Sequence, residues 1–381
     1  MTMRKEREVI VRQQSYSYLS AGATARDIAE QTTRAETNES VPAAPTVPTD
    51  PNTANGLWKQ PAAFFERKIA DDRSLTMPDG QSVTFRNFCN PQIPTHPSAI
   101  LSPLIRIREG QQAQIKLETR QRKQRPIMQQ GQGISRLNLS LGVCLESVES
   151  HIYQWQPRNA GTWFYQSHAS TAHQFEMGLY GVIVVDAEPD QYGRPCAYRN
   201  GPTYDVERFW VFDDVDPAWH ASELDSMSAA QDSRLQKFKP KYFLINGVPN
   251  TEVLHHPDVA IEAKLGDKVL LRLMNASFSL VKVEIERLNA DIVSVDGNAL
   301  GSEERPWTHW ISVAPQQPVR LATASRHDLL IDLDPALGGV EGPGEYKVTI
   351  EFLDGARRQV HNVDADHPAH VGRATTTIRV L

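Results

Sequence analysis

The chain is dominated by short runs of alternating apolar and polar residues, separated by turn-forming residues, and this pattern begins at about Ala62. Such runs predict β-strands, and many short strands in succession predict a β-sandwich or a barrel. Neither half of the pattern shows long helical periodicity. We therefore expect an all-β protein. The clearest runs are Leu104–Leu117, His151–Gln156, Gly161–Tyr165, Gly178–Asp186, Arg208–Asp213, Lys241–Ile245, Val259–Asn275, Val281–Ile285, Ile292–Val295, Asp328–Leu333, Tyr346–Phe352 and Thr375–Leu381.

The two halves of this pattern resemble each other. The segment around Gly110 (REGQQAQIKLE) and the segment around Gly266 (KLGDKVLLRLMN) each contain a Gly turn followed by an alternating strand. Duplication of one sandwich is the simplest explanation, and 381 residues are enough for two domains. The boundary lies in the Pro/Gly/Asp-rich stretch Glu188–Thr203. The expected organisation is a first sandwich at residues 61–190, a linker at 191–240 with a possible helix at Ala221–Lys237, and a second sandwich at 241–381.

Residues 1–60 have a different character. They are polar and include the Pro/Thr/Ala-rich stretch Val41–Pro51. Such a segment has too little apolar surface to offset its ordering entropy, so we expect an extended arm that becomes ordered on binding a partner. Met1–Gln14 is charged and lacks the apolar region of an export signal, which predicts a cytoplasmic protein.

Composition excludes several classes of protein. The net charge is −6 and the isoelectric point is near 6.1, which gives no basic field for nucleic acid. The short basic run Arg120–Arg125 is interpreted as a solvated loop. No stretch approaches the ~20 apolar residues that a membrane helix needs. Cys89, Cys144 and Cys196 lie far apart, which favours buried free thiols in a reducing compartment, although one disulfide remains open.

One segment resembles a known family. Residues Tyr153–Asp186 (YQWQPRNAGTWFYQSHASTAHQFEMGLYGVIVVD) resemble the end of the first cupredoxin domain of multicopper oxidases. The order and spacing of further similar segments agree, and together they cover most of residues 75–353. The resemblance implies two cupredoxin-like Greek-key β-sandwich domains with an extended N-terminal arm. The further segments are Met77–Gly80 (MPDG), Tyr204–Asp214 (YDVERFWVFDD), Phe243–Gly247 (FLING), Gly266–Ser277 (GDKVLLRLMNAS) and Val295–Gly297 (VDG).

The copper ligands of that family do not recur in this sequence. A trinuclear copper cluster in the family requires four His-x-His motifs, because paired imidazoles on alternating strand positions point into one cavity. This chain contains no His-x-His, and the place of one motif reads Gln166-Ser167-His168. Two other places where the family carries histidines, Arg120–Arg136 and Val281–Gly297, have none, and no cysteine has the spacing of a blue-copper ligand. We therefore expect no catalytic residue, no cofactor and no metal, with copper as the alternative.

Some histidines remain as candidates. His168 and His173 are the residual candidates for a metal pair, although hydrogen-bonded loop histidines are the favoured interpretation. His255 and His256 adjoin Pro257 in a predicted turn, and their side chains would point to opposite faces and not easily chelate one ion. A C-terminal set has the residue types to hold a divalent ion, but a polar surface segment is favoured. This set is His361, Asp364, Asp366, His367 and His370.

Two further groups are interpreted as structural. Asp213 and Asp214 stand at a strand end and would face opposite ways, so we expect them to be solvated. The aromatic group formed by Trp155, Trp163, Phe164 and Tyr165 is interpreted as sandwich core plus surface partners, with Trp163 and Tyr165, or the residues that alternate with them, in the core. No signature of a nucleotide-binding loop, a nucleophile elbow or a zinc protease is present.

These observations favour a non-catalytic structural or interaction subunit of a larger protein assembly, docked partly through the N-terminal arm. Relatives of this fold work in electron transfer, so a membrane-bound redox or photosynthetic complex is the suggested host. The partners would be other protein subunits, not nucleic acid. The alternative is a copper-dependent oxidoreductase with a reduced or subunit-shared copper site, in a periplasmic location. A module that binds a small molecule between the domains is a third possibility.

Overall fold

The computed structural model describes residues 53–54, 57–58, 60–93, 96, 98–118, 127–130, 150–167, 171–221, 238–337, 339–355 and 357–381. Nearly all of the expected arm at residues 1–60 lies outside this part of the chain, apart from the short paired strands β1 (Thr53–Ala54) and β2 (Leu57–Trp58). Residues 222–237 of the expected helix, the basic run Arg120–Arg125 and Cys144 also lie outside it. Cys89 and Cys196 are buried free thiols, as expected.

The first sandwich consists of two four-stranded sheets, with strand orders β4-β3-β6-β8 and β5-β10-β9-β7. Apolar side chains between the sheets form its core, in which Phe88, Ile115 and Ile183 are fully buried. The strands are β3 (Ala63–Thr76), β4 (Ser82–Cys89), β5 (Ile105–Arg108), β6 (Ala113–Glu118), β7 (Ile127–Gln130), β8 (Ser150–Trp155), β9 (Gly161–Ser167) and β10 (Tyr180–Asp186).

The second sandwich has a larger sheet with the order β13-β12-β11-β15-β21-β17-β18, in which β19 also pairs with β17, and a five-stranded sheet with the order β14-β23-β22-β16-β20. Its strands are β11 (Val206–Val215), β12 (Tyr242–Ile245), β13 (Val248–Pro249), β14 (Ile261–Ala263), β15 (Lys268–Asn275), β16 (Leu280–Ile285), β17 (Ala290–Val295), β18 (Asn298–Ala299), β19 (Ile311–Val313), β20 (Val319–Leu321), β21 (Arg326–Asp332), β22 (Gly344–Leu353) and β23 (Arg373–Val380). The helices are α2 (Thr171–Glu176), α3 (Pro217–His220) and the 3₁₀ turn η2 (Pro368–His370).

The two sandwiches repeat one topology. In the first, β3 pairs antiparallel with β4 and parallel with β6, and β6 pairs antiparallel with β8. In the second, β11 pairs antiparallel with β12 and parallel with β15, and β15 pairs antiparallel with β21. The opposite sheets repeat as well, because the parallel pair β5–β10 corresponds to the parallel pair β14–β23. The all-β fold and the duplication expected from the Gly110 and Gly266 segments are therefore confirmed.

The structure differs from the expected linker at residues 191–240. Strand β11 lies within that range, yet seven of its residues pair with β15, from Val206–Val269 to Phe212–Asn275. Its apolar run FWVF explains the difference, because a strand that is covered on both faces consists of consecutive apolar residues and does not alternate. Strand β11 is thus a central strand of the second sandwich.

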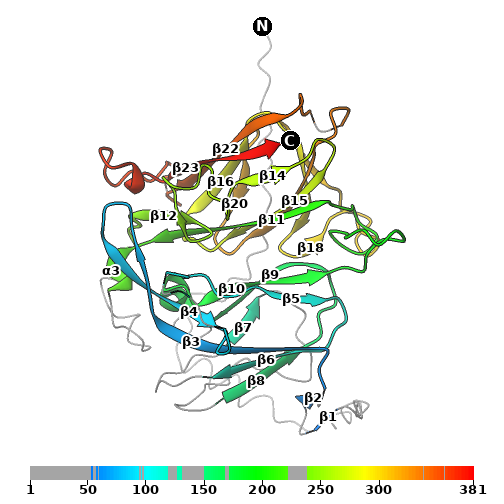
Figure 1. The fold of residues 1–381 in the computed structure, drawn as a ribbon, viewed down its shortest axis with the longest axis horizontal. Coiled ribbons are helices and arrows are strands. Elements are labelled where there is room, and N and C mark those ends of the chain that lie inside the picture. The colour runs from blue at the N-terminus through cyan, green and yellow to red at the C-terminus, as the bar shows by residue number, and fades with distance from the viewer. Residues whose placement is uncertain are drawn as a thin grey trace, which may run out of the picture. The chain divides into compact units, whose positions relative to one another are not determined.

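The sheet β5-β10-β9-β7 of the first sandwich faces the sheet of β11 and β15 of the second, as Figure 1 shows. Phe164 and Tyr180 of the first sandwich pack with Val211 and Met274 of the second. This packing explains why all seven residues of β9 are buried. Trp163 and Tyr165 lie in the core of the first sandwich, as expected.

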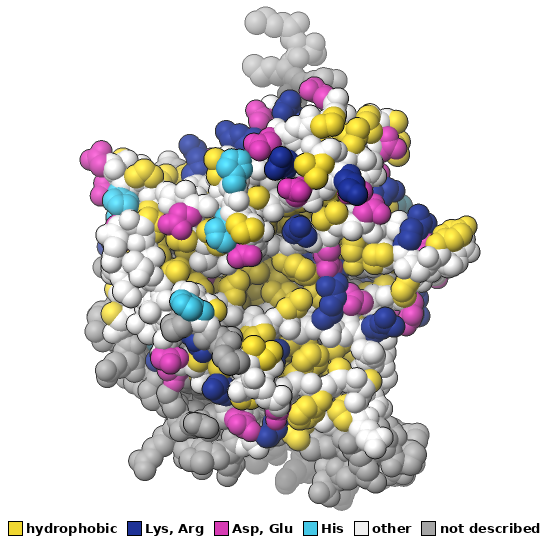
Figure 2. Space-filling model, viewed as in Figure 1, with side chains coloured by type: hydrophobic (Ala, Val, Ile, Leu, Met, Phe, Trp, Pro, Cys, Tyr) yellow, Lys and Arg dark blue, Asp and Glu magenta, His cyan; other side chains and the backbone are white. Residues whose placement is uncertain are grey.

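The expectation that this aromatic group includes surface partners is wrong, because all four side chains are buried. Phe164 is fully buried because the second sandwich covers the face of β9 that would otherwise be exposed to solvent, and Trp155 lies in the core. The outer surface is mixed in character: on the face drawn in Figure 2, Lys and Arg side chains lie among Asp and Glu side chains, with apolar side chains between them.

Candidate functional site

A buried arginine lies where the two sandwiches meet. On β15, Leu271 and Leu273 point into the core of the second sandwich, so the alternation of the strand directs Arg272 toward the first sandwich. Its guanidinium donates hydrogen bonds to Oε1 of Glu207 (2.8 Å), to Oδ2 of Asp328 (3.1 Å) and to Oγ1 of Thr162 on β9 (2.9 Å). The arginine therefore binds acceptors on both sandwiches.

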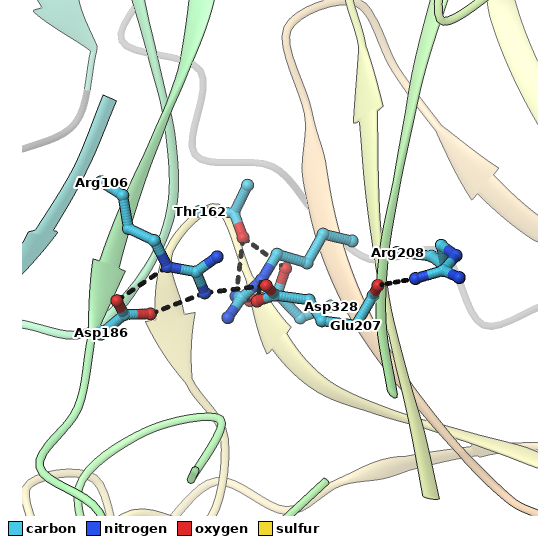
Figure 3. A network of polar contacts seen from close by, with 7 residues as sticks. Arg106, Thr162, Asp186, Glu207, Arg208 and Asp328 are labelled. Atoms are coloured by element: carbon cyan, nitrogen blue, oxygen red, sulfur yellow. Dashed lines mark hydrogen bonds and ion pairs between the residues drawn. The ribbon is translucent and has the colours of Figure 1, made fainter. Parts of the chain in front are cut away.

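This contact extends into a network across the interface (Figure 3). Arg106 on β5 donates two hydrogen bonds to the carboxylate of Asp186 and a third to Glu207, each of 2.8 Å. The Thr162 hydroxyl donates to Oδ1 of Asp328 over 2.7 Å. Burial raises the pKa of Asp328 although Arg272 opposes this shift, so the carboxylate depends on its arginine partner. Because every charge has a partner, the network can hold the two sandwiches in one relative position.

A second group at the interface consists of carboxylates alone. Glu176 ends α2 in the first sandwich, and Asp213 and Asp214 lie near the end of β11 in the second. All three side chains are buried, and one oxygen atom of each lies within 4.8 Å of one from each of the others. Among the described residues, this is the one group of three or more His, Cys, Asp or Glu side chains with such spacing. We call it the carboxylate cluster.

Each carboxylate has fixed partners. Oδ2 of Asp213 accepts a hydrogen bond from the Tyr180 hydroxyl (2.8 Å). Asp214 accepts from the backbone N–H groups of Phe278 (2.8 Å) and Ser279 (3.0 Å) and also from the Ser279 hydroxyl. Oε1 of Glu176 accepts from the backbone N–H of Asp216 (2.9 Å), whereas its Oε2 has no hydrogen-bond partner.

The proximity of three buried acids changes their titration. Burial raises the pKa of Glu176 well above its usual range, and the charges of Asp214 and Asp213 raise it further. Burial also raises the pKa of Asp213 well above its usual range. Burial raises the pKa of Asp214 to about 6, although the hydrogen bonds that Asp214 accepts from Ser279 and Phe278 lower it. Low-dielectric surroundings disfavour the charged form of each acid.

His220 lies beside this cluster. Asp216 caps α3 by accepting a hydrogen bond from the N–H of Ala218, and Pro217 begins the helix, so His220 is held in its first turn. Nδ1 of His220 lies 2.6 Å from the Thr84 carbonyl oxygen, and a carbonyl only accepts, so this nitrogen carries the proton in the neutral ring. Nε2 lies 3.3 Å from Oε1 of Glu176 and makes no hydrogen bond. Burial lowers the pKa of His220 to about 4.

The structure does not bring the two residual metal candidates from the sequence into one described site. His168 lies outside the described residues. His173 is in α2 and not in a loop, and its Nε2 lies 3.1 Å from the Trp219 carbonyl oxygen. Gln166, at the position that resembles a copper-binding histidine, is a buried amide on β9.

The other histidines are dispersed. His255 lines a surface pocket beside β14, and His256 lies 3.8 Å from Asp258. The C-terminal set is divided, because Nε2 of His361 contacts the Ser279 hydroxyl (3.0 Å), whereas His370 contacts Asp79 (3.0 Å) and stacks on His367.

The expectation of solvated carboxylates at Asp213 and Asp214 is wrong, because the first sandwich covers the end of β11. The run FWVF before them carried the available signal, since a continuous apolar run indicates burial on both faces. Glu176 and His220 gave no such signal, because only the packing of the two sandwiches brings them to β11.

Comparisons with known proteins agree with this architecture. Residues 81–190 match the sequence model of the multicopper oxidase family. The fold is similar to that of the blue copper oxidase from Nitrosomonas europaea, at 17% identity over 84% of this chain and 86% of that chain, with a TM-score of 0.59. It is also similar to the copper nitrite reductase from Nitrosomonas europaea, at 16% identity over 83% of this chain and 93% of that chain, with a TM-score of 0.55. No curated protein matches the chain.

Proposed function

Because this chain has the cupredoxin-type fold of the multicopper oxidases and contains a multicopper oxidase domain at residues 81–190, we propose that it is a member of that group without copper catalysis, acting as a structural subunit of a larger protein assembly. The fold alone does not decide activity, which depends on the side chains of the site.

The chemistry of the donor groups carries this proposal. Copper in this fold is held by imidazoles and thiolates. The sequence has no His-x-His motif, and the group of potential ligands that gathers in the described part of the chain is the carboxylate cluster Glu176, Asp213 and Asp214. Gln166 occupies one expected histidine position. The residues present therefore do not fit the copper cluster of the family.

An exposed aromatic segment supports a protein partner. The side chain of Trp307 is 75% exposed, and Trp310 and Ile311 nearby are also exposed. In the described part of the chain, β19, which begins at Ile311, pairs only with β17. Large exposed apolar side chains and an open strand edge both favour association with another protein. We call residues 307–311 the tryptophan edge.

The host assembly is inferred from the chemistry of the relatives. Structural neighbours of this fold are copper oxidases and a nitrite reductase, which are redox proteins. We infer that the chain is a peripheral component of a redox assembly, and we propose a membrane-bound redox or photosynthetic complex as the host. The described residues contain no helix long and apolar enough to cross a bilayer.

A copper assay tests the non-catalytic assignment. The protein is produced with added Cu²⁺, dialysed, and compared with a copper nitrite reductase treated in the same way. We expect no thiolate-to-copper absorption band, no oxidation of phenolic substrates and no nitrite reduction. A coloured protein that turns over either substrate would establish the alternative, a copper oxidoreductase with a reduced or subunit-shared copper site.

A pair of variants tests the docking of a partner. Trp307→Ser removes the most exposed aromatic side chain of the tryptophan edge, and Leu337→Ser, at a position that is 70% exposed, is the matched control. After purification from the native source under mild detergent, we expect the wild type and Leu337→Ser to elute as a large complex of constant composition and Trp307→Ser to lose it. Elution of the wild type as a free monomer would refute the subunit role.

A further inference from the structure

The carboxylate cluster has no positively charged Lys or Arg partner among the described residues. Glu176, Asp213 and Asp214 are all buried, yet none of them forms an ion pair with Lys or Arg in the described part of the chain. In the neighbouring network, by contrast, Arg272 and Arg106 neutralise the buried acids. Burying several carboxylates is costly unless they are protonated or are paired with a cation. The cluster therefore has the composition of a site that takes up protons or a positive ion.

The spacing of the oxygen atoms fits a metal ion. Divalent cations bind carboxylate oxygens at about 2.2 Å, so two ligands on opposite sides of one ion are about 4.4 Å apart. Three ligands cannot all lie on opposite sides of one ion, and at this bond length their oxygen atoms are about 3.1–3.8 Å apart. The oxygen atoms of the three carboxylates lie within 4.8 Å of one another, so the side chains would close around the ion. The three side chains come from α2 and β11, so their positions are fixed by both sandwiches.

A second, independent observation points to a ligand. His220 is fully buried, and its Nδ1 is held by the Thr84 carbonyl oxygen at 2.6 Å, so the neutral ring presents the lone pair of Nε2 toward Glu176. This nitrogen makes no hydrogen bond, and neither does Oε2 of Glu176. Histidines that serve metal sites commonly have the other ring nitrogen fixed in this way.

We propose that Glu176, Asp213 and Asp214 form a binding site for one divalent cation of the oxygen-preferring class, with His220 at its edge. The ion would join α2 of the first sandwich to β11 of the second and replace the missing arginine. This role is structural, it differs from the copper chemistry of the fold, and it does not depend on the proposed partner.

Mn²⁺ is a suitable probe because it prefers oxygen ligands, whereas Cu²⁺ and Zn²⁺ would also bind the surface histidines. The full chain is produced with Mn²⁺, dialysed, and analysed for metal content and for melting temperature. Glu176→Gln keeps the acceptor for the Asp216 N–H but removes a charged ligand, and Asp213→Asn removes a second one. Asp364→Asn, in the C-terminal set beside His370, is the matched control.

We expect one Mn²⁺ per wild-type chain, a higher melting temperature with Mn²⁺ than without it, and an affinity at least about tenfold lower in Glu176→Gln and Asp213→Asn but unchanged in Asp364→Asn. Wild-type crystals grown with Mn²⁺ provide a test that does not depend on the folding of a variant, because anomalous scattering should place the ion among the three carboxylates. A wild type that binds no Mn²⁺, equal binding by Glu176→Gln, or an ion located elsewhere would overturn the proposal.

Discussion

At the scale of single residues, Gly297 shows how closely the two sandwiches fit. This glycine lies in the turn between β17 and β18 and has a φ of +72°. A Cβ atom at this position would lie 2.4 Å from the ring of Trp163, which belongs to the first sandwich. The turn therefore needs glycine for two reasons, the left-handed backbone and the space beside the indole.

We predict that Gly297→Ala lowers the free energy of unfolding by about 3 kcal/mol, of which about 1 kcal/mol is backbone strain and the rest is overpacking against Trp163. Urea denaturation followed by tryptophan fluorescence measures this change. Gly266→Ala is the control, since its φ is +90° but a Cβ there would meet nothing within 4 Å. A loss of equal size in both variants would show that contact with Trp163 contributes nothing.

The turn at Gly297 could be predicted from the sequence, because the VDG segment follows an apolar run and Gly is the residue that adopts a positive φ most easily. Its contact with Trp163 could not. The two residues are far apart in the chain, and only the association of the sandwiches brings them together. The same limit applies to Glu176 and His220, whose proximity to Asp213 is a product of tertiary packing.

At the scale of elements, the turn between β3 and β4 attaches to the second sandwich through Asp79. Its Oδ2 accepts hydrogen bonds from Nζ of Lys241 (2.8 Å) and from the hydroxyl of Tyr242 (2.7 Å), and it lies 3.0 Å from Nε2 of His370. Burial alone would raise the pKa of Asp79, but the hydrogen bonds from Lys241, Tyr242 and the Gln81 backbone hold it well below its usual range.

This shift predicts a pH dependence. Because the pKa of Asp79 is lower in the folded state than in the unfolded state, its stabilising contribution is fully present above about pH 4 and is lost as the pH falls through the folded pKa. We expect Asp79→Asn to lower the free energy of unfolding at pH 7 by about 1 kcal/mol or less, since the group is partly exposed, and to flatten the loss of stability below pH 4. Denaturation curves between pH 7 and the acid limit measure both effects.

Asp72→Asn is the control for this prediction, because the side chain of Asp72 is 86% exposed and its nearest cation, Arg73, is 3.9 Å away. Its unfolding curves should match those of the wild type at every pH. An Asp79→Asn variant with the same acid-range slope as Asp72→Asn would contradict the assignment of that slope to the turn.

The positions of the strands could be predicted from the sequence better than which of their side chains are buried. Alternating runs such as Val281–Ile285 and Tyr346–Phe352 lie on β16 and β22, which are each covered on one face. Strands β9 and β11 break the rule, because the second covering layer comes from the other sandwich. Alternation predicts a solvated Asp213 at the end of β11, but the side chain is buried for this reason.

At the scale of the whole molecule, the sandwiches are joined by apolar clusters and by a polar network in which Arg106 pairs with Glu207 and Thr162 contacts both Arg272 and Asp328. The apolar contacts contribute most of the attraction, as they do in domain cores. The polar network acts differently, because the desolvation of its buried pair Arg272–Asp328, which lies within the second sandwich, offsets most of the attraction between the two charges. Its effect is to penalise any arrangement in which one charge loses its partner. The network of Figure 3 therefore determines how the two sandwiches are positioned against each other more than it contributes to the free energy of unfolding.

This view predicts a non-additive effect on stability. Arg272→Met removes the ion-pair partner of Asp328, which stays buried beside Thr162 with only the weaker charge interaction of Arg326, and we expect the free energy of unfolding to fall by about 3–5 kcal/mol. The double variant Arg272→Met/Asp328→Leu removes both charges, so its stability should lie closer to that of the wild type than to that of the single variant. Urea denaturation followed by circular dichroism measures all three proteins.

Arg287→Ala is the control for this comparison, because the pair of Arg287 with Glu341 (3.4 Å) is exposed and should contribute less than about 1 kcal/mol. If the double variant were as unstable as Arg272→Met or less stable, the removal of Asp328 would relieve nothing, and the argument that an unpaired buried charge is penalised would be lost. If Arg272→Met instead cost no more than Arg287→Ala, Asp328 would have to find another cation at the interface, since a buried carboxylate without one cannot remain charged at low cost.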